Sequence, residues 1–175
     1  PDRPGLSIAD LGTGSGCLLV AMLSGRPDVT GVGIEADPDA ASLAAENIAR
    51  HGLERRASVM VSTWKDWQGW QGVDLIISNP PYICTDVIST LDPEVRIHDP
   101  AAALDGGEDG LDAYREIAGL ARTFLKPGAP LVLEIGFDQN RAVREILSAA
   151  GHVGVGGGKD LGGNDRVVWA IQPES

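Results

Sequence analysis

The segment Leu6-Ser7-Ile8-Ala9-Asp10-Leu11-Gly12-Thr13-Gly14-Ser15-Gly16 joins a short apolar run to a turn of alternating glycines. The run Leu6–Leu11 is typical of a buried strand, and a helical pattern over Cys17–Leu23 follows the turn directly. Glycine lets the backbone pass close beneath a ligand, and the start of a helix presents free N–H groups. The G-x-G-x-G spacing differs from the G-x-G-x-x-G of dinucleotide folds, and no lysine follows as in a P-loop. The segment therefore predicts a strand–turn–helix unit that favours a ligand with a carboxylate over one with a pyrophosphate.

Alternating strands and helices are expected along the rest of the chain. Further strands are predicted at Val29–Ile34, Ser58–Ser62, Val73–Ser78 and Leu131–Ile135, with a last pair at Val153–Val155 and Arg166–Ile171. Helices are predicted at Asp39–Arg50, Leu111–Leu125 and Gln139–Ala150, and residues 83–110 are predicted to form a long loop or short helices. The 175 residues are therefore expected to form one α/β domain, doubly wound around a mostly parallel sheet, with an antiparallel hairpin at the carboxyl end.

An acidic residue, Glu35, follows the second predicted strand. Ligands of such sheets bind beyond the carboxyl ends of the strands, and an acid at this place can accept hydrogen bonds from both hydroxyls of a ribose. A ribose-binding acid beside a glycine turn that lacks the signature of a pyrophosphate site indicates S-adenosylmethionine as the ligand.

The tetrapeptide Asn79-Pro80-Pro81-Tyr82, called the proline loop below, follows the predicted strand Val73–Ser78. The two prolines fix φ and remove two backbone donors, and each restricts the residue before it to extended geometry. A stiff rim results, on which the Asn79 carboxamide and unpaired carbonyls face outward. Such a rim can hold and polarise a planar NH2 group, so the residues alone leave a side-chain amide, an adenine and a guanine open as targets.

Composition narrows the classes of partner. The net charge is −11 and the isoelectric point is about 4.5, with Arg55-Arg56 as a short basic pair. Proteins that bind duplex nucleic acid generally carry a basic surface, so nucleic acid is not expected as the main partner. The two cysteines lack C-x-x-C spacing and the three histidines are scattered, so neither a disulfide framework nor a metal site is predicted. Without a membrane-length apolar stretch or a signal peptide, the protein is expected to be cytoplasmic.

These motifs resemble those of class I S-adenosylmethionine-dependent methyltransferases. The chain is most similar to the HemK/PrmC-type protein-(glutamine-N5) methyltransferases, which modify the glutamine in the Gly-Gly-Gln loop of peptide-chain release factors. The resemblance covers nearly the whole chain, and the combination of stretches is far more specific than the proline loop by itself. The stretches that carry it are Ala9–Gly16, Ser78–Ile83, Val95–Leu104 with Asp99-Pro100, Leu104–Leu111, Leu133–Gly136 and Asp160–Val167.

The resemblance implies a Rossmann-like sheet of seven strands in the order 3-2-1-4-5-7-6 and S-adenosylmethionine as methyl donor, with S-adenosylhomocysteine as product. It implies that the cofactor is bound by Asp10, Gly12, Thr13, Gly14, Gly16, Glu35, Thr63, Trp64 and Asn79. The implied catalytic residues are Asn79, Pro80 and Tyr82, and Pro81 joins them in binding the substrate. Asn79 and the Pro80 carbonyl would accept both N–H bonds of the target amide and aim its nitrogen at the methyl group, while Tyr82 walls the pocket.

The chain departs from the family pattern at two points. Thr63 stands where family members commonly carry an acid that binds the adenine amino group, so weaker cofactor binding is expected. The helical amino-terminal domain of the family, which helps to dock the release factor, is absent from these 175 residues.

There are two alternative functions. A nucleic-acid amino methyltransferase, with a flipped adenine or guanine stacked on Tyr82, is one alternative. An inactive cofactor-binding scaffold is the other.

Other side chains are interpreted as mainly structural. Glu134 lies in an apolar strand, where an acid needs a partner, and it is expected to anchor the loop after Tyr82 or to shape the pocket. Trp64, Trp67 and Trp70 recur every third residue, which predicts packing along one face of a short helix or turn, with Trp64 at the edge of the adenine site.

Overall fold

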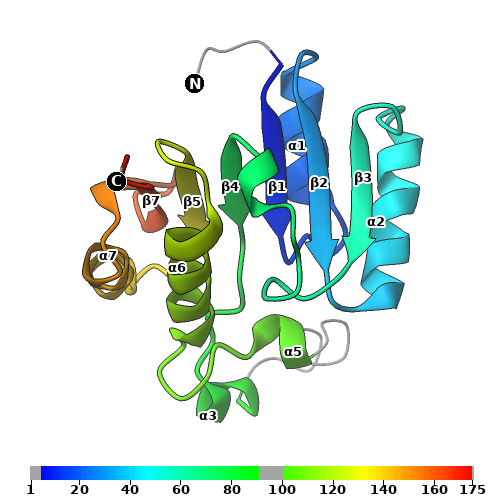
Figure 1. The fold of residues 1–175 in the computed structure, drawn as a ribbon. Helices are drawn as coiled ribbons and strands as arrows, with labels where there is room; N and C mark the ends of the chain where they lie inside the picture. The colour runs from blue at the N-terminus through cyan, green and yellow to red at the C-terminus, as the bar shows by residue number, and fades with distance from the viewer. Residues whose placement is uncertain (1–4, 91–100, 175) are drawn as a thin grey trace.

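A seven-stranded sheet forms the centre of the molecule in the computed structural model, which describes residues 5–90 and 101–174. The strands are β1 (Ser7–Leu11), β2 (Thr30–Glu35), β3 (Ala57–Val61), β4 (Leu75–Ser78), β5 (Pro130–Glu134), β6 (Val153–Lys159) and β7 (Asp165–Ile171). Their order is β3-β2-β1-β4-β5-β7-β6, and only the pairs β5–β7 and β6–β7 are antiparallel (Figure 1). The predicted fold class and strand order are confirmed. Most of the stretch Val95–Leu104, with Asp99-Pro100, lies outside the described residues.

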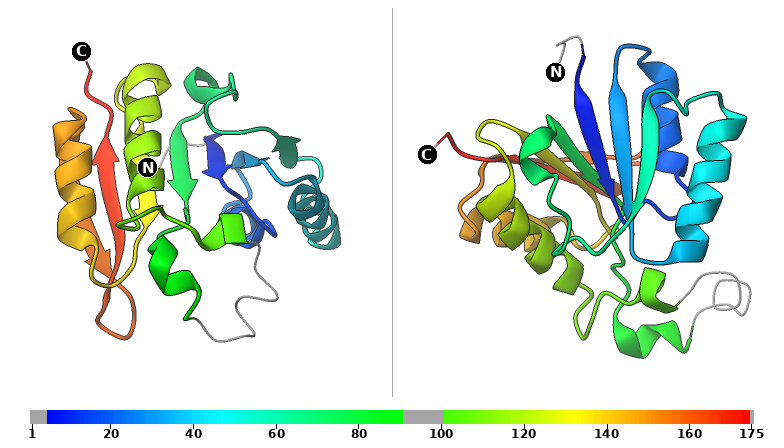
Figure 2. Two further views of the ribbon diagram at one scale, coloured as in Figure 1. Left: turned by 90° about the horizontal axis from the view of Figure 1, so that it is seen from below. Right: turned by 45° about the vertical axis from the view of Figure 1, so that its right-hand side comes forward.

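Helices cover both faces of this sheet, as the two views in Figure 2 show. They are α1 (Cys17–Gly25), α2 (Pro38–Arg50), α3 (Thr85–Ile88), α5 (Ala101–Leu104), α6 (Asp112–Phe124), α7 (Asn140–Ala149) and the 3-10 helix η1 (Trp70–Gly72). The helix α2 begins one residue before the predicted start, because Asp37 caps it by accepting a hydrogen bond from Asp39 N at 2.8 Å and Pro38 takes the first helical position.

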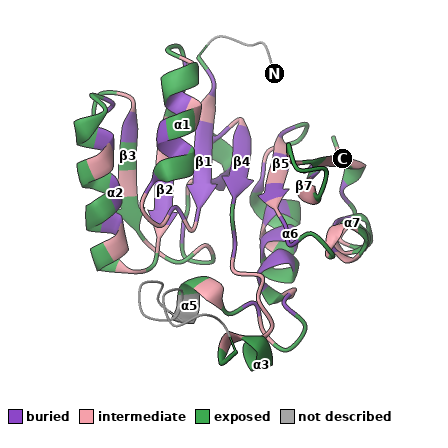
Figure 3. Ribbon diagram, turned by 180° about the vertical axis from the view of Figure 1, so that it is seen from behind, coloured by how far each residue is buried: buried purple, intermediate pink, exposed green. Residues whose placement is uncertain are grey.

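Alternate residues of the inner strands divide between two cores, one on each face of the sheet. Ala9 and Ile76 pack with the buried sides of α6 and α7, whereas Ile8 and Ile77 pack with α1 and α2. Figure 3 shows β1 and β4 as mostly buried strands, with less buried segments beyond their carboxyl ends. Both faces of the sheet are thus covered by helices, and the carboxyl ends of the inner strands are left less covered.

The carboxyl-terminal hairpin is longer than predicted. The predicted strand Val153–Val155 continues to Lys159 through three glycines, which have little intrinsic preference for strands. Pairing with β7 stabilises this segment, because the indole of Trp169 packs over glycines that have no side chains of their own. A Cβ atom built on Gly156 would lie 2.5 Å from Trp169 Cε2, so the ring occupies the space of the missing side chain.

The short helices α3 and α5 lie beyond the carboxyl ends of β1 and β4 (Figure 1). A parallel bridge between Ile83 and Asp105 joins the segments next to these helices, with Ile83 N donating to Leu104 O at 3.0 Å and Gly106 N donating to Ile83 O at 2.8 Å. In the described ranges, 5–90 and 101–174, no helix has the length and apolarity to cross a bilayer, and no three His, Cys, Asp or Glu side chains gather as metal ligands.

Candidate active site

Three adjacent strands end at one level of the sheet. In the register of β1 with its two neighbours, Leu11 pairs with Ile34 of β2 and with Ser78 of β4. The buried hydroxyl of Ser78 donates to Leu11 O at 2.6 Å and so ties the end of β4 to the start of the glycine turn. The residues that follow the three paired positions are Gly12, Glu35 and Asn79. The predicted glycine turn, the predicted ribose-binding residue Glu35 and the proline loop are therefore neighbours.

The glycine turn is left-handed at three positions. The φ angles of Gly12, Gly14 and Gly16 are +67°, +54° and +79°, which L side chains rarely adopt. A Cβ atom on Gly14 would meet no atom within 4 Å, so a side chain there would project into open space beside the turn. Gly16 serves packing instead, since its Cβ would lie 3.2 Å from Ala44 Cβ on α2, and it does not line the cleft described below.

The carboxylate of Glu35 joins two turns. Oε2 accepts a hydrogen bond from Gly14 N at 2.8 Å, and Oε1 accepts one from Asp37 N at 3.0 Å. Each oxygen of an ionised carboxylate has a second acceptor site. Glu35 therefore fixes the shape of the glycine turn and keeps one acceptor site on each oxygen, an arrangement that suits the two hydroxyls of a ribose.

Asp10 is a buried acid beneath the glycine turn. It is 1% exposed, and its Oδ2 accepts a hydrogen bond from the buried Thr13 Oγ1 at 2.7 Å. Burial raises the pKa of Asp10 to about 7, and the charge of Glu35 contributes to this rise, while hydrogen bonds from Thr13 and the Leu19 backbone oppose it. The carboxyl of Asp10 therefore changes its charge near neutral pH.

The proline loop exposes the side chain of Asn79. Asn79 is exposed, Pro80 is buried, and Tyr82 is half-buried. Within residues 5–90 and 101–174, the carboxamide of Asn79 has no hydrogen-bond partner. An exposed amide on a backbone stiffened by two prolines is preorganised to receive donors from a ligand.

Two adjoining cavities of about 590 Å³ each form one cleft over these strand ends. Each volume falls within the usual range of small-molecule sites. The residues common to both are Gly12, Gly14, Ser15, Asn79, Pro81 and Ala103. Asp10, Pro80, Tyr82 and Glu134 line the first cavity, and Glu35, Leu43, Thr63 and Trp64 line the second. Asn79 therefore stands at the junction of the two halves, and Glu134 shapes the pocket as predicted.

The tryptophans divide between the cleft and the core. Trp67 and Trp70 are buried with ring centroids 5.4 Å apart, while Trp64 lines the cleft and lies 3.4 Å from a Cβ atom built on Gly12. Thr63 lies at the rim, where its hydroxyl donates to Asp66 Oδ2 at 2.7 Å and accepts from Asp66 N at 3.2 Å. Thr63 thus closes a turn that presents the Trp64 indole to the cleft.

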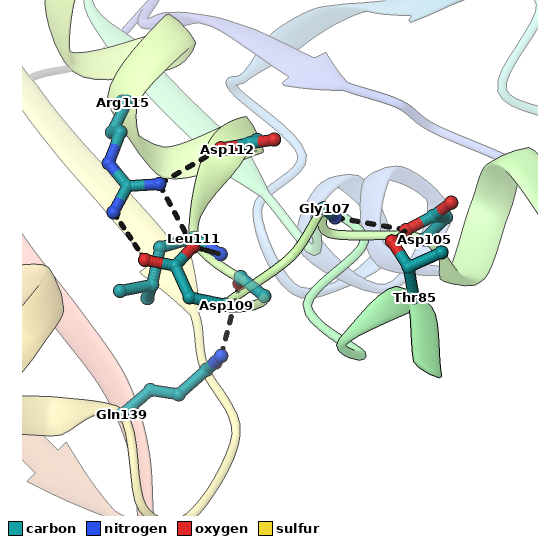
Figure 4. Close-up of polar contacts among 9 residues, drawn as sticks. Thr85, Asp105, Gly107, Asp109, Leu111, Asp112, Arg115 and Gln139 are labelled. Atoms are coloured by element: carbon teal, nitrogen blue, oxygen red, sulfur yellow. Dashed lines mark hydrogen bonds and ion pairs between the residues drawn. The ribbon is translucent and has the colours of Figure 1, made fainter. Parts of the chain in front are cut away.

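Hydrogen bonds from other segments hold the carboxyl end of the proline loop and the residues that follow it. Figure 4 shows Asp105, whose Oδ1 accepts hydrogen bonds from Thr85 Oγ1 at 2.7 Å and Gly107 N at 3.0 Å. The same view includes Gln139, which donates to Gly110 O at 3.1 Å and also to Tyr82 O at 3.1 Å. Sequence reasoning did not single out Gln139. It lies four residues after the buried Ile135 and directly before α7, a position that gives no periodic or charge signal.

The comparisons with known proteins agree with this geometry. A family model described as "Methyltransferase small domain" matches residues 1–101. A release factor glutamine methyltransferase from Caulobacter vibrioides is 48% identical over 172 residues, which cover 98% of this chain and 60% of that protein. Another from Agrobacterium fabrum is 47% identical over 161 residues, which cover 92% of this chain and 55% of that protein. The chain thus spans little more than half the length of these relatives.

Known structures share the fold at low sequence identity. The S-adenosylmethionine-dependent methyltransferase SibL has a TM-score of 0.71 and is 16% identical, covering 98% of this chain and 51% of its own. An RNA methyltransferase from Salinibacter ruber, in complex with S-adenosyl-L-homocysteine, has a TM-score of 0.62 and is 18% identical, covering 97% and 82%. These likenesses establish the class I methyltransferase fold. Since the family model covers more than half of the residues, the chain belongs to the methyltransferase small domain family.

Proposed function

We propose that this protein transfers the methyl group of S-adenosylmethionine to the side-chain amide nitrogen of the glutamine in the Gly-Gly-Gln loop of a peptide-chain release factor. The observation that carries the proposal is the placement of Asn79, whose carboxamide is exposed at the junction of the two halves of the cleft. The names of the relatives, nearly half identical in sequence, support glutamine as the target.

The residues of the cleft suit the proposed cofactor. The open space above Gly14 gives room for a ligand to lie against the backbone, and Glu35 keeps acceptor sites for two ribose hydroxyls. Trp64 and Leu43 provide apolar surface for an adenine ring in the same half of the cleft. Asp10 lies in the other half, where its carboxylate favours the ammonium of the methionine part. When bound, S-adenosylmethionine supplies an electrophilic methyl group and leaves as S-adenosylhomocysteine.

The proline loop would orient the acceptor. The lone pair of an amide nitrogen is delocalised into its carbonyl, so reaction demands orientation more than a strong base. Asn79 Oδ1 and the Pro80 carbonyl would each accept one N–H bond, which holds the nitrogen in line with the methyl group and the departing sulfur. The N–C bond would form as the C–S bond breaks, and the same two acceptors stabilise the positive charge that develops on the nitrogen. The methylated nitrogen would then release one of its N–H protons to solvent, which leaves a neutral secondary amide. Tyr82 would wall the pocket and exclude water from the amide.

Mass spectrometry of a release factor after incubation with the protein and S-adenosylmethionine tests this function. One added methyl group on the Gly-Gly-Gln glutamine is expected, with loss of transfer in Asn79→Ala. Asn164→Ala is a matched control, because Asn164 is an exposed asparagine that lines neither half of the cleft. Labelled methyl in RNA or DNA and none in the release factor would replace the proposal with the nucleic-acid alternative. Cofactor binding without transfer to any of these substrates would support a scaffold.

A further inference from the structure

Gln139, at the start of α7, has every hydrogen-bonding position of its carboxamide engaged. Nε2 donates to two carbonyl oxygens, Tyr82 O and Gly110 O, each at 3.1 Å. Oε1 accepts from Gly136 N at 3.0 Å and lies 3.3 Å from the hydroxyl of Tyr114. A carbonyl can only accept and a backbone N–H can only donate, so these partners fix which end of the amide faces which segment.

This amide joins the proline loop to two other segments. Pro80 and Pro81 have no N–H groups, so the loop cannot be held through its own donors at those positions. Its carboxyl end is held through the Tyr82 carbonyl instead, and the donor comes from Gln139. The next residue, Ile83, donates its N–H to Leu104 O, so that Tyr82 and Ile83 are held by two different segments.

The segment around Gly110 brings a second carbonyl to Gln139 Nε2. Gly110 has a φ of +72°, and a Cβ atom there would lie 2.5 Å from Tyr82 O and 2.9 Å from Gln139 Nε2. Only glycine lets the Gly110 carbonyl and the Tyr82 carbonyl reach one NH2 group together. Arg115 reinforces the loop from outside by pairing with Asp109 and Asp112 (Figure 4).

We propose that Gln139 is a positioning residue for methyl transfer, which fixes the Tyr82 carbonyl and through it the direction in which Asn79 and the Pro80 carbonyl face the acceptor amide. The inference rests on the proposed function. Gln139 lines neither half of the cleft. Its loss should therefore slow transfer without weakening cofactor binding, because a small misplacement of reacting groups is costly to rate.

Gln139→Glu is the informative variant, since it keeps the size and one acceptor but turns a carboxylate oxygen toward two carbonyls. We expect kcat to fall by about tenfold or more, with the Kd for S-adenosylmethionine unchanged within about twofold. Gln139→Leu, which removes the amide without adding charge, should slow transfer as well. Gln172→Glu is the matched control. Gln172 follows β7 and is a 5% exposed amide whose Nε2 donates to Arg122 O at 2.8 Å, beside the amino end of β5. It should lose stability and keep its kcat.

Amide hydrogen exchange provides a readout that does not depend on turnover. In Gln139→Glu, exchange at Ile83 N and Gly106 N should accelerate by about tenfold, while exchange at Gly12 N, which donates to Ile34 O, should not change. If the unmodified protein methylates no release factor, the proposed function fails, and the exchange result still decides whether Gln139 holds the loop. An unchanged kcat in both Gln139 variants, or equal acceleration at Ile83 in Gln172→Glu, would overturn the inference.

Discussion

The ionisation of Asp10 gives the folded protein a pH dependence that a single substitution isolates. A rise in the pKa from 3.8 to about 7 corresponds to about 4 kcal/mol of free energy of unfolding, at about 1.4 kcal/mol per pH unit. Because the folded protein favours the protonated carboxyl, this stability is fully present below pH 3.8. It is lost as the pH rises and is gone above about pH 7. Asp10→Asn keeps a neutral group of similar shape at every pH.

Urea denaturation of both proteins from pH 5 to pH 8 measures this effect. The free energy of unfolding of the unmodified protein, minus that of Asp10→Asn, should fall by about 3 kcal/mol across this range. Titrating groups other than Asp10 are the same in both proteins, so their contributions cancel in the difference. A difference that does not vary with pH would show that Asp10 ionises equally in the folded and unfolded states, and would refute the reasoning.

The remaining predictions concern the turn, the strand ends and the end of α1. Gly14→Ala places a methyl group in the cleft at a positive φ and should weaken S-adenosylmethionine binding by about tenfold or more, measured by calorimetry, while unchanged affinity would contradict a ligand at the turn. Ser78→Ala removes the buried bond to Leu11 O and should lower the free energy of unfolding by about 1 to 2 kcal/mol in urea, and no loss would contradict this. Arg56→Met removes donors to three backbone carbonyls and should cost about 1 to 3 kcal/mol, whereas an equal loss in the exposed control Arg55→Met would contradict a specific role.

The strand-end features of the site could be predicted because they follow from local sequence and a general property of parallel sheets. Glycine spacing identified the turn, and Glu35 and Asn79 each directly follow a predicted strand. The carboxyl ends of neighbouring parallel strands meet at one edge, so these residues had to be neighbours. The resemblance to the methyltransferase family supplied the strand order, which pattern alone does not determine.

Contacts between segments distant in the sequence could not be predicted. Gln139 lies 57 residues from its partner Tyr82, and a single glutamine at the start of a helix has no pattern that reveals this pairing. The hydrogen bonds of Arg56 could not be predicted for the same reason, because its carbonyl partners lie in the last turn of α1 and in the segment between α1 and β2. Strand β6 was underestimated because its stability comes from the indole of Trp169 on the next strand.

A crystal structure of the protein with S-adenosylhomocysteine and a peptide containing Gly-Gly-Gln would test the central claim most directly. We expect the ribose hydroxyls on Glu35, and the glutamine NH2 group bonded to Asn79 Oδ1 and the Pro80 carbonyl, with its nitrogen facing the sulfur. A glutamine amide bound elsewhere, or a nitrogen turned away from the sulfur, would contradict it.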